Sequence, residues 1–543
     1  MSLAVAREER LQQPLPGQEP LVLVADPIAE EGLAILRPHT RIEIVVGNRE
    51  ALERNLGQAE ALLVRSETRV TEALLDSAPR LRVIGRAGAG VDTIDVAAAT
   101  ARGIVVVNAP GGNAVAAAEH SLALMFALAR RVAPADASLK RGEWARSRYI
   151  GSELTGKTLG LIGLGRVGSE VARRAQGLDM RVIVFDPYVP DEHVHRIGLE
   201  PVELDALLES SDFVSLHVPL TEATRGILNA ERIASMRPGA FVVNCARGGL
   251  VDEPALLAAL DDGRLAGAGI DVFGTEPVAD DDPLPRHPKV VATPHLGAST
   301  VEAQANVATQ VAHEVLAVLE GHPTQFAVNV PSLRPEDVEA LQPYLGLVVM
   351  LGKLATQLAD DHLRSAEISY RGEIAERNVG VLTAAAVQGL LEPISATPVN
   401  LVNARLLAQQ RGLDVVETRS STPSHYTSLV RVTVNTRAGA TSVAGVISDG
   451  RANVVQIDDY ELHLAPTPGY LLVTQHVDRP GMIGLVGTLL GEADINISSM
   501  QVGRKTRRGE ALMLLSVDEP VPPAVVERIR HAASVATIKV IKL

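Results

Sequence analysis

The sequence has few cysteines and few aromatic residues. It contains one cysteine, Cys245, in 543 residues, and Phe, Trp and Tyr together make up 3% of the chain. A single cysteine excludes a framework of internal disulfides and fits the reducing cytosol. Hydrophobic residues, mostly Ala, Val and Leu, make up 46% of the chain, and helix-like and strand-like runs alternate. The chain is too long for one core, so we predict an α/β protein of about three or four domains.

Signals for membrane insertion and secretion are also missing. The longest apolar run, Val115 to Ala129, contains Glu119 and His120 and is too short to span a bilayer. Residues 1–20 are polar and lack the apolar core of a signal peptide, so we predict a disordered leader and a cytoplasmic protein. The net charge of −14 argues against nucleic acid as a partner. Small anions remain possible ligands, because a local cluster of arginines can outweigh the global charge.

The chain is organised around a glycine-rich segment. We predict a buried strand over 157–162, a tight turn at 163–165 and a helix over 169–176. This is the GxGxxG fingerprint in the strand–turn–helix context that dinucleotide binding requires. Gly163 permits the turn, Gly165 lets the backbone approach a diphosphate, and Gly168 lets the helix pack on the strand. Glycine-rich turns also occur without ligands, so the prediction of a dinucleotide site depends on the strand that follows as well.

That next strand ends in a carboxylate. The apolar run Arg181 to Phe185 leads to Asp186, which lies 18 residues after Gly168. A carboxylate at this spacing takes the hydroxyls of the adenosine ribose and would repel a 2′-phosphate. The sequence therefore predicts NAD rather than NADP.

Three later strands of the same predicted sheet lead to Arg247, Glu276 and His295. The carboxyl ends of parallel strands meet at one edge, so these side chains should converge. An Arg offers a planar fork for a carboxylate, a His titrates near neutrality, and Glu276 could accept the other ring N–H. Each alone could be a surface ion pair, a turn carboxylate or a core histidine. Together they predict hydride transfer with acid–base catalysis.

The first 110 residues predict a smaller parallel α/β unit, with strand ends at Arg65 and at the loop 86–92. Arg65 could equally be a solvated charge, and the glycines of the loop a plain turn. Asn113 is predicted to cap a long apolar helix over 114–131. Arg146, beside a Trp144 that we expect to be buried, could reach an anion. Cys245 is interpreted as a small apolar residue rather than a nucleophile, because no histidine is evidently paired with it.

These motifs resemble those of the NAD-dependent D-2-hydroxyacid dehydrogenases. The resemblance is densest over residues 21–330 and rests on the segments 244–249, 271–277 and 294–300. The segments 65–66, 86–92 and 111–113 resemble the branch of the family that oxidises 3-phospho-D-glycerate. The resemblance implies a Rossmann NAD-binding domain (111–301) inserted into a flavodoxin-like substrate domain (21–110 and 302–330). It also implies that the helix after Thr300 returns to the first domain.

The same resemblance implies a role for each matching residue. The catalytic set would be Arg247, Glu276 and His295. Residues expected to bind the cofactor are Gly163, Gly165, Arg166, Val167, Gly168, Asp186, Val218, Cys245, Arg247, Asp271, His295, Gly297 and Ala298. Residues expected to bind substrate are Arg65, Ser66, Gly88, Ala89, Gly90, Asn113 and, from a neighbouring subunit, Arg146. Ala89 departs from relatives that have threonine there and leaves only backbone N–H groups. No metal is expected.

The C-terminal part predicts two further modules. Residues 335–460 alternate helices and strands without a cluster of metal-binding residues, and the resemblance makes them an intervening α+β domain. Residues 468–543 predict the ferredoxin-like order βαββαβ. His476, Asp478 and Asn496 resemble the amino-acid-binding turn of ACT regulatory domains, although a plain Pro-Gly turn is an equal alternative. The resemblance implies L-serine as effector, and ACT sheet edges that pair across subunits to give a homodimer or homotetramer.

Two other functions stay open from the sequence. The substrate could be glyoxylate, hydroxypyruvate or D-lactate, although Arg65 and Arg146 favour a phosphorylated 2-hydroxy acid. The fold could also serve as an NAD-sensing interaction module, which the intact Arg–Glu–His set disfavours.

Overall fold

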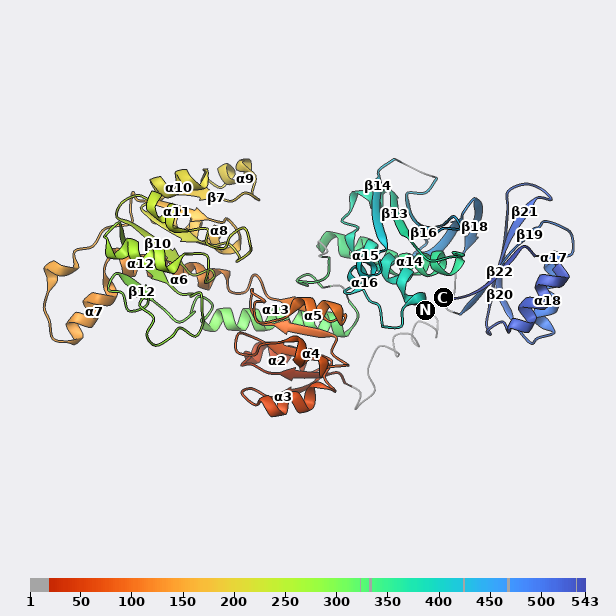
Figure 1. Ribbon diagram of the computed structural model, residues 1–543, viewed down its shortest axis with the longest axis horizontal. Coiled ribbons are helices and arrows are strands. Elements are labelled where there is room, and N and C mark those ends of the chain that lie inside the picture. Colours follow the sequence, from red (N-terminus) through yellow and green to blue (C-terminus); the bar gives the residue numbers. More distant parts are fainter. Residues whose placement is uncertain (1–18, 323, 332–334, 423–424, 466–468, 534) are drawn as a thin grey trace.

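Four β-sheets follow one another along the chain in the computed structural model (Figure 1). The structure describes residues 19–543 except 323, 332–334, 423–424, 466–468 and 534. The predicted leader at 1–20 therefore lies almost entirely outside the described residues. The molecule is elongated, with the second and fourth sheets at opposite ends (Figure 1).

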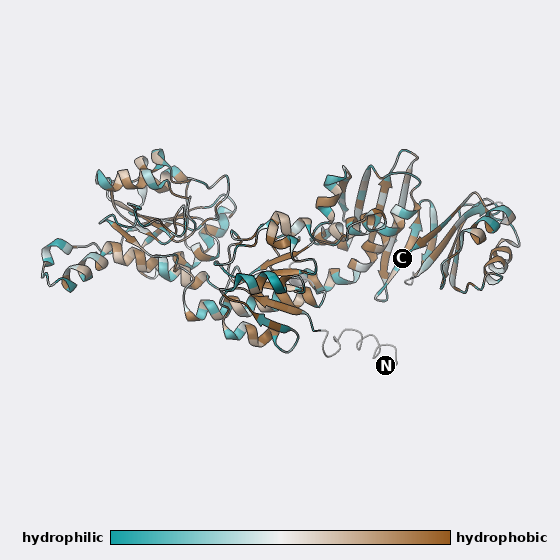
Figure 2. Ribbon diagram, turned by 60° about the horizontal axis from the view of Figure 1, so that its bottom comes forward, coloured by the Kyte–Doolittle hydropathy of each residue, from teal (hydrophilic) through white to brown (hydrophobic). Residues whose placement is uncertain are grey.

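The first sheet has five parallel strands in the order β2-β1-β3-β4-β5, which is the flavodoxin-like order. Its strands are β1 (Leu21–Val24), β2 (Arg41–Ile44), β3 (Ala61–Val64), β4 (Val83–Arg86) and β5 (Val105–Asn108), and its helices are α2 (Glu30–Leu36), α3 (Arg49–Leu56), α4 (Glu72–Asp76) and α5 (Val96–Ala101). Figure 2 shows hydrophobic colouring concentrated in the strands of this sheet. The sequence interpretation did not predict β5.

The second sheet has seven parallel strands in the order β12-β11-β10-β9-β6-β7-β8, as in a Rossmann fold. Its strands are β6 (Thr158–Ile162), β7 (Arg181–Phe185), β8 (Glu200–Pro201), β9 (Phe213–Leu216), β10 (Ala240–Asn244), β11 (Leu265–Ile270) and β12 (Val290–Ala292). Its helices are α8 (Arg166–Gln176), α9 (Asp191–Arg196), α10 (Leu204–Ser210), α11 (Ala230–Ser235) and α12 (Glu253–Asp261).

Two helices lie between the first and second sheets in the sequence. They are α6 (Ala114–Ala129) and α7 (Val132–Lys140), followed by the short 3-10 turn η2 (Arg146–Tyr149). The helix predicted over 114–131 ends early because Arg131 adopts a left-handed backbone, with φ of 52°. The chain therefore bends there, and α7 projects from the body of the molecule (Figure 1).

The predicted return of the chain to the first sheet is made by α13 (Val301–Leu319). Val311 and Val315 of this helix lie against Gly85 of β4, where a Cβ atom would approach both within 3 Å. Val307, Val311 and Val315 share one apolar core with the strands of the first sheet. A helix that follows the second sheet therefore completes the first one.

The third sheet has six strands in the order β14-β13-β15-β16-β17-β18. The strands are β13 (Ser365–Gly372), β14 (Asp414–Ser420), β15 (Ser428–Asn435), β16 (Ala440–Ser448), β17 (Arg451–Ile457) and β18 (Tyr460–Leu464), and the helical elements are α14 (Pro335–Leu358), η3 (Glu373–Glu376), α15 (Gly380–Leu391), η4 (Glu392–Ile394) and α16 (Ala404–Gln410). Only β13 and β15 had been predicted among these strands. The other four are short or carry polar residues and glycine, which weakens the period-2 signal.

Helix α14 is the one described helix that is long and apolar enough to cross a membrane, over Asp337–Leu358. Its apolar side chains Leu347, Leu351 and Leu354 are fully buried in the core of the third sheet. It therefore serves as the central helix of this domain.

The fourth sheet is antiparallel, with the order β20-β21-β19-β22. Its elements are β19 (Tyr470–Val477), α17 (Met482–Gly491), β20 (Ile497–Arg504), β21 (Glu510–Val517), α18 (Pro523–Ala533) and β22 (Thr537–Lys542), which is the predicted βαββαβ order. One face packs on α17 and α18. The opposite face shares a core with the third sheet through Leu471, Val473, Leu512, Leu514 and Ile541.

The expectation that the edges of the fourth sheet are open is partly wrong. At the β22 edge, Lys539 forms an ion pair with Asp360 after α14, at 2.6 Å. At the β20 edge, a Cβ atom on Gly503 would lie 2.9 Å from the carbonyl oxygen of Glu461 in β18. Ser498, Ser499, Met500, Val502 and Arg504 of β20 remain exposed. The last two domains are therefore joined through a sheet face and both sheet edges.

Two glycines let α14 and α15 approach each other closely. A Cβ atom on Gly352 would lie 2.4 Å from the carbonyl oxygen of Ala386, and one on Gly389 would lie 2.0 Å from that of Val349. Contacts this short leave no room for a methyl group. By contrast, nothing lies within 4 Å of a Cβ atom on Gly487 in α17.

We predict that Gly389→Ala lowers the free energy of unfolding by about 1–3 kcal/mol, because the methyl group forces the two helices apart. The matched change Gly487→Ala should raise it by up to about 1 kcal/mol, since alanine favours the helix and meets no atom. Hydrogen exchange in peptides from α14 and α17 measures the two effects separately. Stabilisation by both changes would show that the helices are not in close contact.

Candidate active site

The glycine-rich turn lies between β6 and α8 and is shaped for a diphosphate. Gly163 has a φ of 98°, and a Cβ atom there would lie 2.7 Å from the carbonyl oxygen of His217. A Cβ atom on Gly168 would lie 2.2 Å from the carbonyl oxygen of Gly163. In front of Gly165, no atom lies within 4 Å of the Cβ position. The space at Gly165, next to the first amides of α8, therefore fits a diphosphate.

The other predicted cofactor residues surround this turn. The Asp186 carboxylate follows β7 and accepts backbone N–H groups of Leu164, at 2.8 Å, and Tyr188, at 2.9 Å. Its oxygens have further lone pairs for ribose hydroxyls. Val218 follows β9 and would touch a Cβ atom on Gly163. Arg166 is the first residue of α8, and its guanidinium lies over the ring of Phe326, 5.6 Å from the ring centre. Val167, the next residue, packs at the edge of the β6–α8 core.

The predicted Arg–Glu–His set comes from three neighbouring strands. Arg247, Glu276 and His295 follow β10, β11 and β12, which are adjacent and parallel. Nδ1 of His295 lies 2.7 Å from Oε2 of Glu276, and Oε1 of Glu276 accepts the backbone N–H of Phe273 at 3.0 Å. The His295 side chain is 48% exposed, so its other nitrogen is accessible. The contact predicted between this carboxylate and imidazole is present.

Arg247 extends from the second sheet to the loop after β4. Its Nε donates to Oδ2 of Asp92 at 3.1 Å. A Cβ atom on Gly90 would lie 2.0 Å from Nη2 of Arg247, so a larger residue there would displace this guanidinium. Two parts of the chain far apart in sequence therefore meet at one site, as the predicted substrate loop requires.

A cluster of arginines surrounds this loop, and one member was not among the predicted site residues. Arg65, Arg86 and Arg247 repel one another, and burial together with Arg247 and Arg65 lowers the pKa of Arg86 to about 10. In the part of the chain that the structure describes, Nε of Arg86 is a buried atom without a hydrogen-bond partner. Its guanidinium lies against Gly88, where a Cβ atom would be 1.5 Å from Nη1. The position of Arg86 at the end of β4 was the available signal.

The remaining substrate residues lie near this cluster. Buried Asp26 accepts the backbone N–H of Arg65, at 2.5 Å, and of Thr68, at 3.2 Å, and so fixes the turn that contains Ser66. The backbone oxygen of Ala89 accepts from the side chain of Asn108 at 2.6 Å. Asn113 occupies the N-cap position of α6, but its side chain makes no cap hydrogen bond.

A second histidine follows the strand next to β10 but differs chemically from His295. His217, after β9, is partly buried, and burial lowers its pKa to about 4. Its Nε2 lies 2.9 Å from the hydroxyl of Ser215. His217 therefore stays neutral at physiological pH, and His295 is the better acid–base group.

Cys245 follows β10 and is the only thiol. Burial, and to a smaller degree Asp271, raises its pKa to about 12, although a hydrogen bond with Ser121 acts in the other direction. A ring nitrogen of His120 lies within 4.8 Å of its sulfur, a proximity that the sequence does not show. Nevertheless, the thiol remains protonated and is a poor nucleophile.

The structure does not bring Arg146 into this cluster. Arg146 begins η2, beyond the projecting helix α7 (Figure 1). The expectation of a buried tryptophan beside it is wrong, because Trp144 is 80% exposed. The segment lacks a core of its own to cover the indole.

The three predicted effector residues lie in the fourth sheet but not together. Asp478 follows β19, and its carboxylate accepts from Arg504, at the end of β20, at 3.2 Å. Asn496 precedes β20 and donates to Asp518 at 2.7 Å, beyond the other end of β21. About seven residues of strand, roughly 23 Å, separate the two positions. His476 is buried, and burial lowers its pKa. Within one chain, Asp478 and Asn496 therefore lie too far apart to hold the same small ligand.

Three protein families match successive parts of the chain. The family described as D-isomer specific 2-hydroxyacid dehydrogenase, NAD binding domain, matches residues 122–297. The D-3-phosphoglycerate dehydrogenase intervening domain matches residues 340–458, and the ACT domain matches residues 470–532. These matches fall on the second, third and fourth sheets.

Similar proteins match nearly the whole chain. A D-3-phosphoglycerate dehydrogenase of Methanocaldococcus jannaschii is 43% identical over 96% of this chain and 99% of its own length. One of Bacillus subtilis is 43% identical with the same coverage. The solved structure of an Aquifex aeolicus D-lactate dehydrogenase complexed with NAD and lactic acid covers 55% of this chain and 96% of its own, with a TM-score of 0.50 and 31% identity. The chain therefore belongs to the NAD-dependent D-2-hydroxyacid dehydrogenase family, within the group of D-3-phosphoglycerate dehydrogenases that carry an intervening domain and an ACT domain.

Proposed function

We propose that this protein oxidises the C2 hydroxyl of 3-phospho-D-glycerate with NAD, giving 3-phosphooxypyruvate. The observation that carries the proposal is the Glu276–His295 pair. It lies at the same sheet edge as Arg247, which forms a cluster with Arg65 and Arg86. The names of the relatives support the same substrate. This reaction is the first step of the phosphorylated route to L-serine, and we propose a cytoplasmic location for it.

His295, Glu276 and Arg247 have different roles in the oxidation of the C2 hydroxyl. When bound, the nicotinamide supplies the acceptor for the hydride that leaves C2. The Glu276 carboxylate at 2.7 Å accepts the N–H at Nδ1 of His295, which leaves Nε2 free to take the proton of the C2 hydroxyl. In the reverse direction the same nitrogen returns the proton. Arg247 binds the substrate carboxylate and the oxygen on C2. The carboxylate would share this guanidinium with Asp92, or replace Asp92 on it.

The arginine cluster supports a phosphorylated substrate. Arg65 and Arg86 come from the ends of β3 and β4, and their mutual repulsion is relieved when a dianion lies between them. The unpartnered Nε of Arg86 gives such an anion a hydrogen-bond donor. Lactate and glyoxylate lack a second anionic group and would leave this cluster uncompensated.

An association of two copies through the projecting arm is also part of the proposal. Phe126, Val132 and Leu139 are exposed along one groove of α6 and α7, and Trp144 and Ile150 follow. A contiguous exposed apolar surface of this kind marks a protein contact. An arm that packs on a second copy would bring Arg146 to the partner's substrate site and give a homodimer.

We further propose that L-serine binds at the ACT domain and inhibits the enzyme. The ligand would bind between two copies, because Asp478 and Asn496 of one chain lie at opposite ends of the sheet. A site shared by two copies would join Asn496 of one chain to Asp478 of its partner.

We predict that His295→Ala lowers kcat by at least about 10²–10⁴-fold, because no other group can take the hydroxyl proton. NAD binding should change little, since the glycine turn and Asp186 are untouched. NADH production and fluorescence titration with NADH measure the two quantities. His322→Ala, at an exposed histidine paired with Glu320, is the control and should retain full activity. Substantial turnover by the His295 variant would remove the proton-carrier assignment.

We predict that Arg86→Gln and Arg65→Gln lower kcat/KM for 3-phospho-D-glycerate by about 10–100-fold, as expected for a lost charge-assisted hydrogen bond. The loss in kcat/KM for unphosphorylated D-glycerate should be at least about fivefold smaller, because this substrate has no phosphate to bind. Arg80→Gln, at an exposed arginine near Glu60, is the control. Equal losses for both substrates would show that these arginines do not bind the phosphate.

We predict that Asp478→Ala and Asn496→Ala each abolish inhibition by L-serine and leave kcat without serine unchanged. A mixture of the two variants, unfolded and refolded together, should regain partial inhibition, because a hybrid dimer contains one intact site. Inhibition curves of the separate and mixed proteins test this. A mixture as insensitive as its components would argue against a site shared by two chains.

A further inference from the structure

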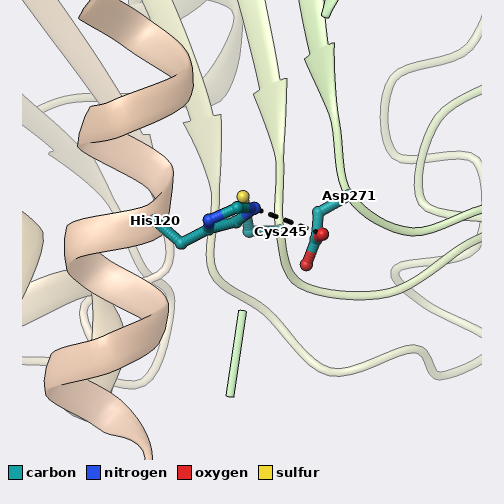
Figure 3. Close-up of side chains that lie close together, drawn as sticks. All are labelled: His120, Cys245 and Asp271. Carbon is teal, nitrogen blue, oxygen red and sulfur yellow. Dashed lines mark ion pairs between the residues drawn. The ribbon is translucent and has the colours of Figure 1, made fainter. Parts of the chain in front are cut away.

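Three side chains with metal-binding atoms meet behind the candidate active site. His120 comes from α6, Cys245 follows β10 and Asp271 follows β11 (Figure 3). Their nitrogen, sulfur and oxygen atoms all lie within 4.8 Å of one another. The spacing alone would allow a metal ion. The hydrogen bonds of the carboxylate, however, indicate another role.

The Asp271 carboxylate is fully buried and accepts three hydrogen bonds. Oδ1 accepts from the hydroxyl of Thr293 at 2.6 Å and from the backbone N–H of Leu296 at 2.7 Å, and it lies 3.3 Å from Nε2 of His120. Oδ2 accepts the backbone N–H of Gly297 at 2.8 Å. Burial alone would raise the pKa of Asp271, but these hydrogen bonds hold it below its ordinary value. The carboxylate is therefore a charged anchor that already holds two backbone amides and one hydroxyl.

The anchored segment is the loop that carries His295. The backbone oxygen of Asp271 accepts the N–H of His295 at 2.8 Å, and its side chain holds the next two amides. His295 itself has a φ of 55°, in the left-handed region that costs a non-glycine residue about 1–3 kcal/mol. Such a backbone persists only when its surroundings fix it. Asp271 fixes this loop and so directs the imidazole towards Glu276.

His120 is the one member of this network that belongs to another part of the chain. The hydroxyl of Thr293 donates its hydrogen bond to Oδ1 of Asp271. Nε2 of His120, 2.9 Å from the same hydroxyl oxygen, must therefore be the donor in that contact. His120 thus carries a proton at Nε2 that it shares between Thr293 and Asp271. An unprotonated Nε2 would face two acceptor oxygens and repel them.

Helix α6 connects this donor to the predicted substrate turn. The helix starts after Asn113, and the preceding Gly112 packs against Val307 of α13, where a Cβ atom would be 2.7 Å away. One turn later, Ala117 lies against Gly297 of the His295 loop. The following turn presents His120 to Asp271 (Figure 3). A single helix thus contacts both the substrate turn and the acid–base loop.

We propose that His120 is a positioning residue for the dehydrogenase reaction. It holds Asp271 and Thr293 from α6, so that the substrate turn at residues 111–113 and the loop of His295 keep a fixed distance. The proposal rests on the proposed function for its reaction, and on the hydrogen bonds of Asp271 for its geometry.

The test compares His120→Leu, which removes the donor, with His120→Gln, whose amide N–H can replace Nε2–H. We expect His120→Leu to lower kcat by about 10–100-fold, because a displaced proton acceptor costs this much in rate. KM should change less than kcat, since the arginine cluster does not change. With C2-deuterated substrate, the isotope effect on kcat should rise towards its full value. His120→Gln should recover most of the rate.

Glu119→Gln is the matched control, because Glu119 is the neighbouring residue on α6 and its exposed side chain pairs with Arg174. It should behave as the unchanged protein. The proposal would be overturned if the activity of His120→Leu fell only in proportion to its folded fraction and its isotope effect stayed unchanged. A metal requirement, seen as loss of activity of the unchanged protein after chelation and its recovery with Zn²⁺, would overturn it too.

A second measurement does not depend on turnover. Diethyl pyrocarbonate modifies accessible histidines, and peptide mass spectrometry reports the rate at His295 alone. We expect this rate to rise at least threefold in His120→Leu and to stay unchanged in His120→Gln and Glu119→Gln. An unchanged rate in all three variants would overturn the positioning role. Lack of turnover by the unchanged protein would instead contradict the proposed function, and the modification rates would still decide the role of His120.

Discussion

The candidate active site depends on the parallel register of β10, β11 and β12. Val243 pairs with Gly269 and Gly269 pairs with Val291, so the three strands end at the same level. Three chain segments separated by tens of residues then leave the sheet side by side. An antiparallel arrangement would send every second segment to the opposite edge. The 2.7 Å contact between Glu276 and His295 is a direct consequence of this register.

The same constraint explains why the dehydrogenase part could be predicted from the sequence. Each functional residue follows a short apolar strand, and the glycine fingerprint identifies the first of these strands. The contact of Glu276 with His295 needed only their positions at neighbouring strand ends. Arg86 was missed as a site residue because a sequence does not reveal whether a buried guanidinium has a partner. Its role follows from Nε, which has none among the described residues, and from its proximity to Arg65 and Arg247.

The wrong predictions concern features that depend on contacts between distant segments. Trp144 was expected to be buried because an indole is large and apolar, yet its segment projects on an arm with no core beneath it. Asp478 and Asn496 were assigned to one ligand because they resemble the amino-acid-binding turn of ACT domains. Only the antiparallel register, with Val477 beside Glu510 and Ile497 beside Val517, shows that they lie at opposite ends. The four missed strands of the third sheet have weak local patterns and are stabilised by their neighbours.

The packing of the last two domains limits how a signal could travel from the fourth sheet to the active site. The third and fourth sheets share one apolar core, in which Leu514 and Tyr460 belong to the same cluster. Close-packed cores transmit displacement rather than absorb it, so these two domains should move as one body. Their described contacts with the dehydrogenase part include the hydrogen bond from Asn400, before α16, to Gly103, after α5, at 2.7 Å. A change at the fourth sheet would therefore reach the catalytic half as a shift of the whole C-terminal body against the first sheet. Because the first sheet carries Arg65, Arg86 and Asp92, such a shift would alter the distance between the substrate loop and Arg247 without disturbing the Glu276–His295 pair.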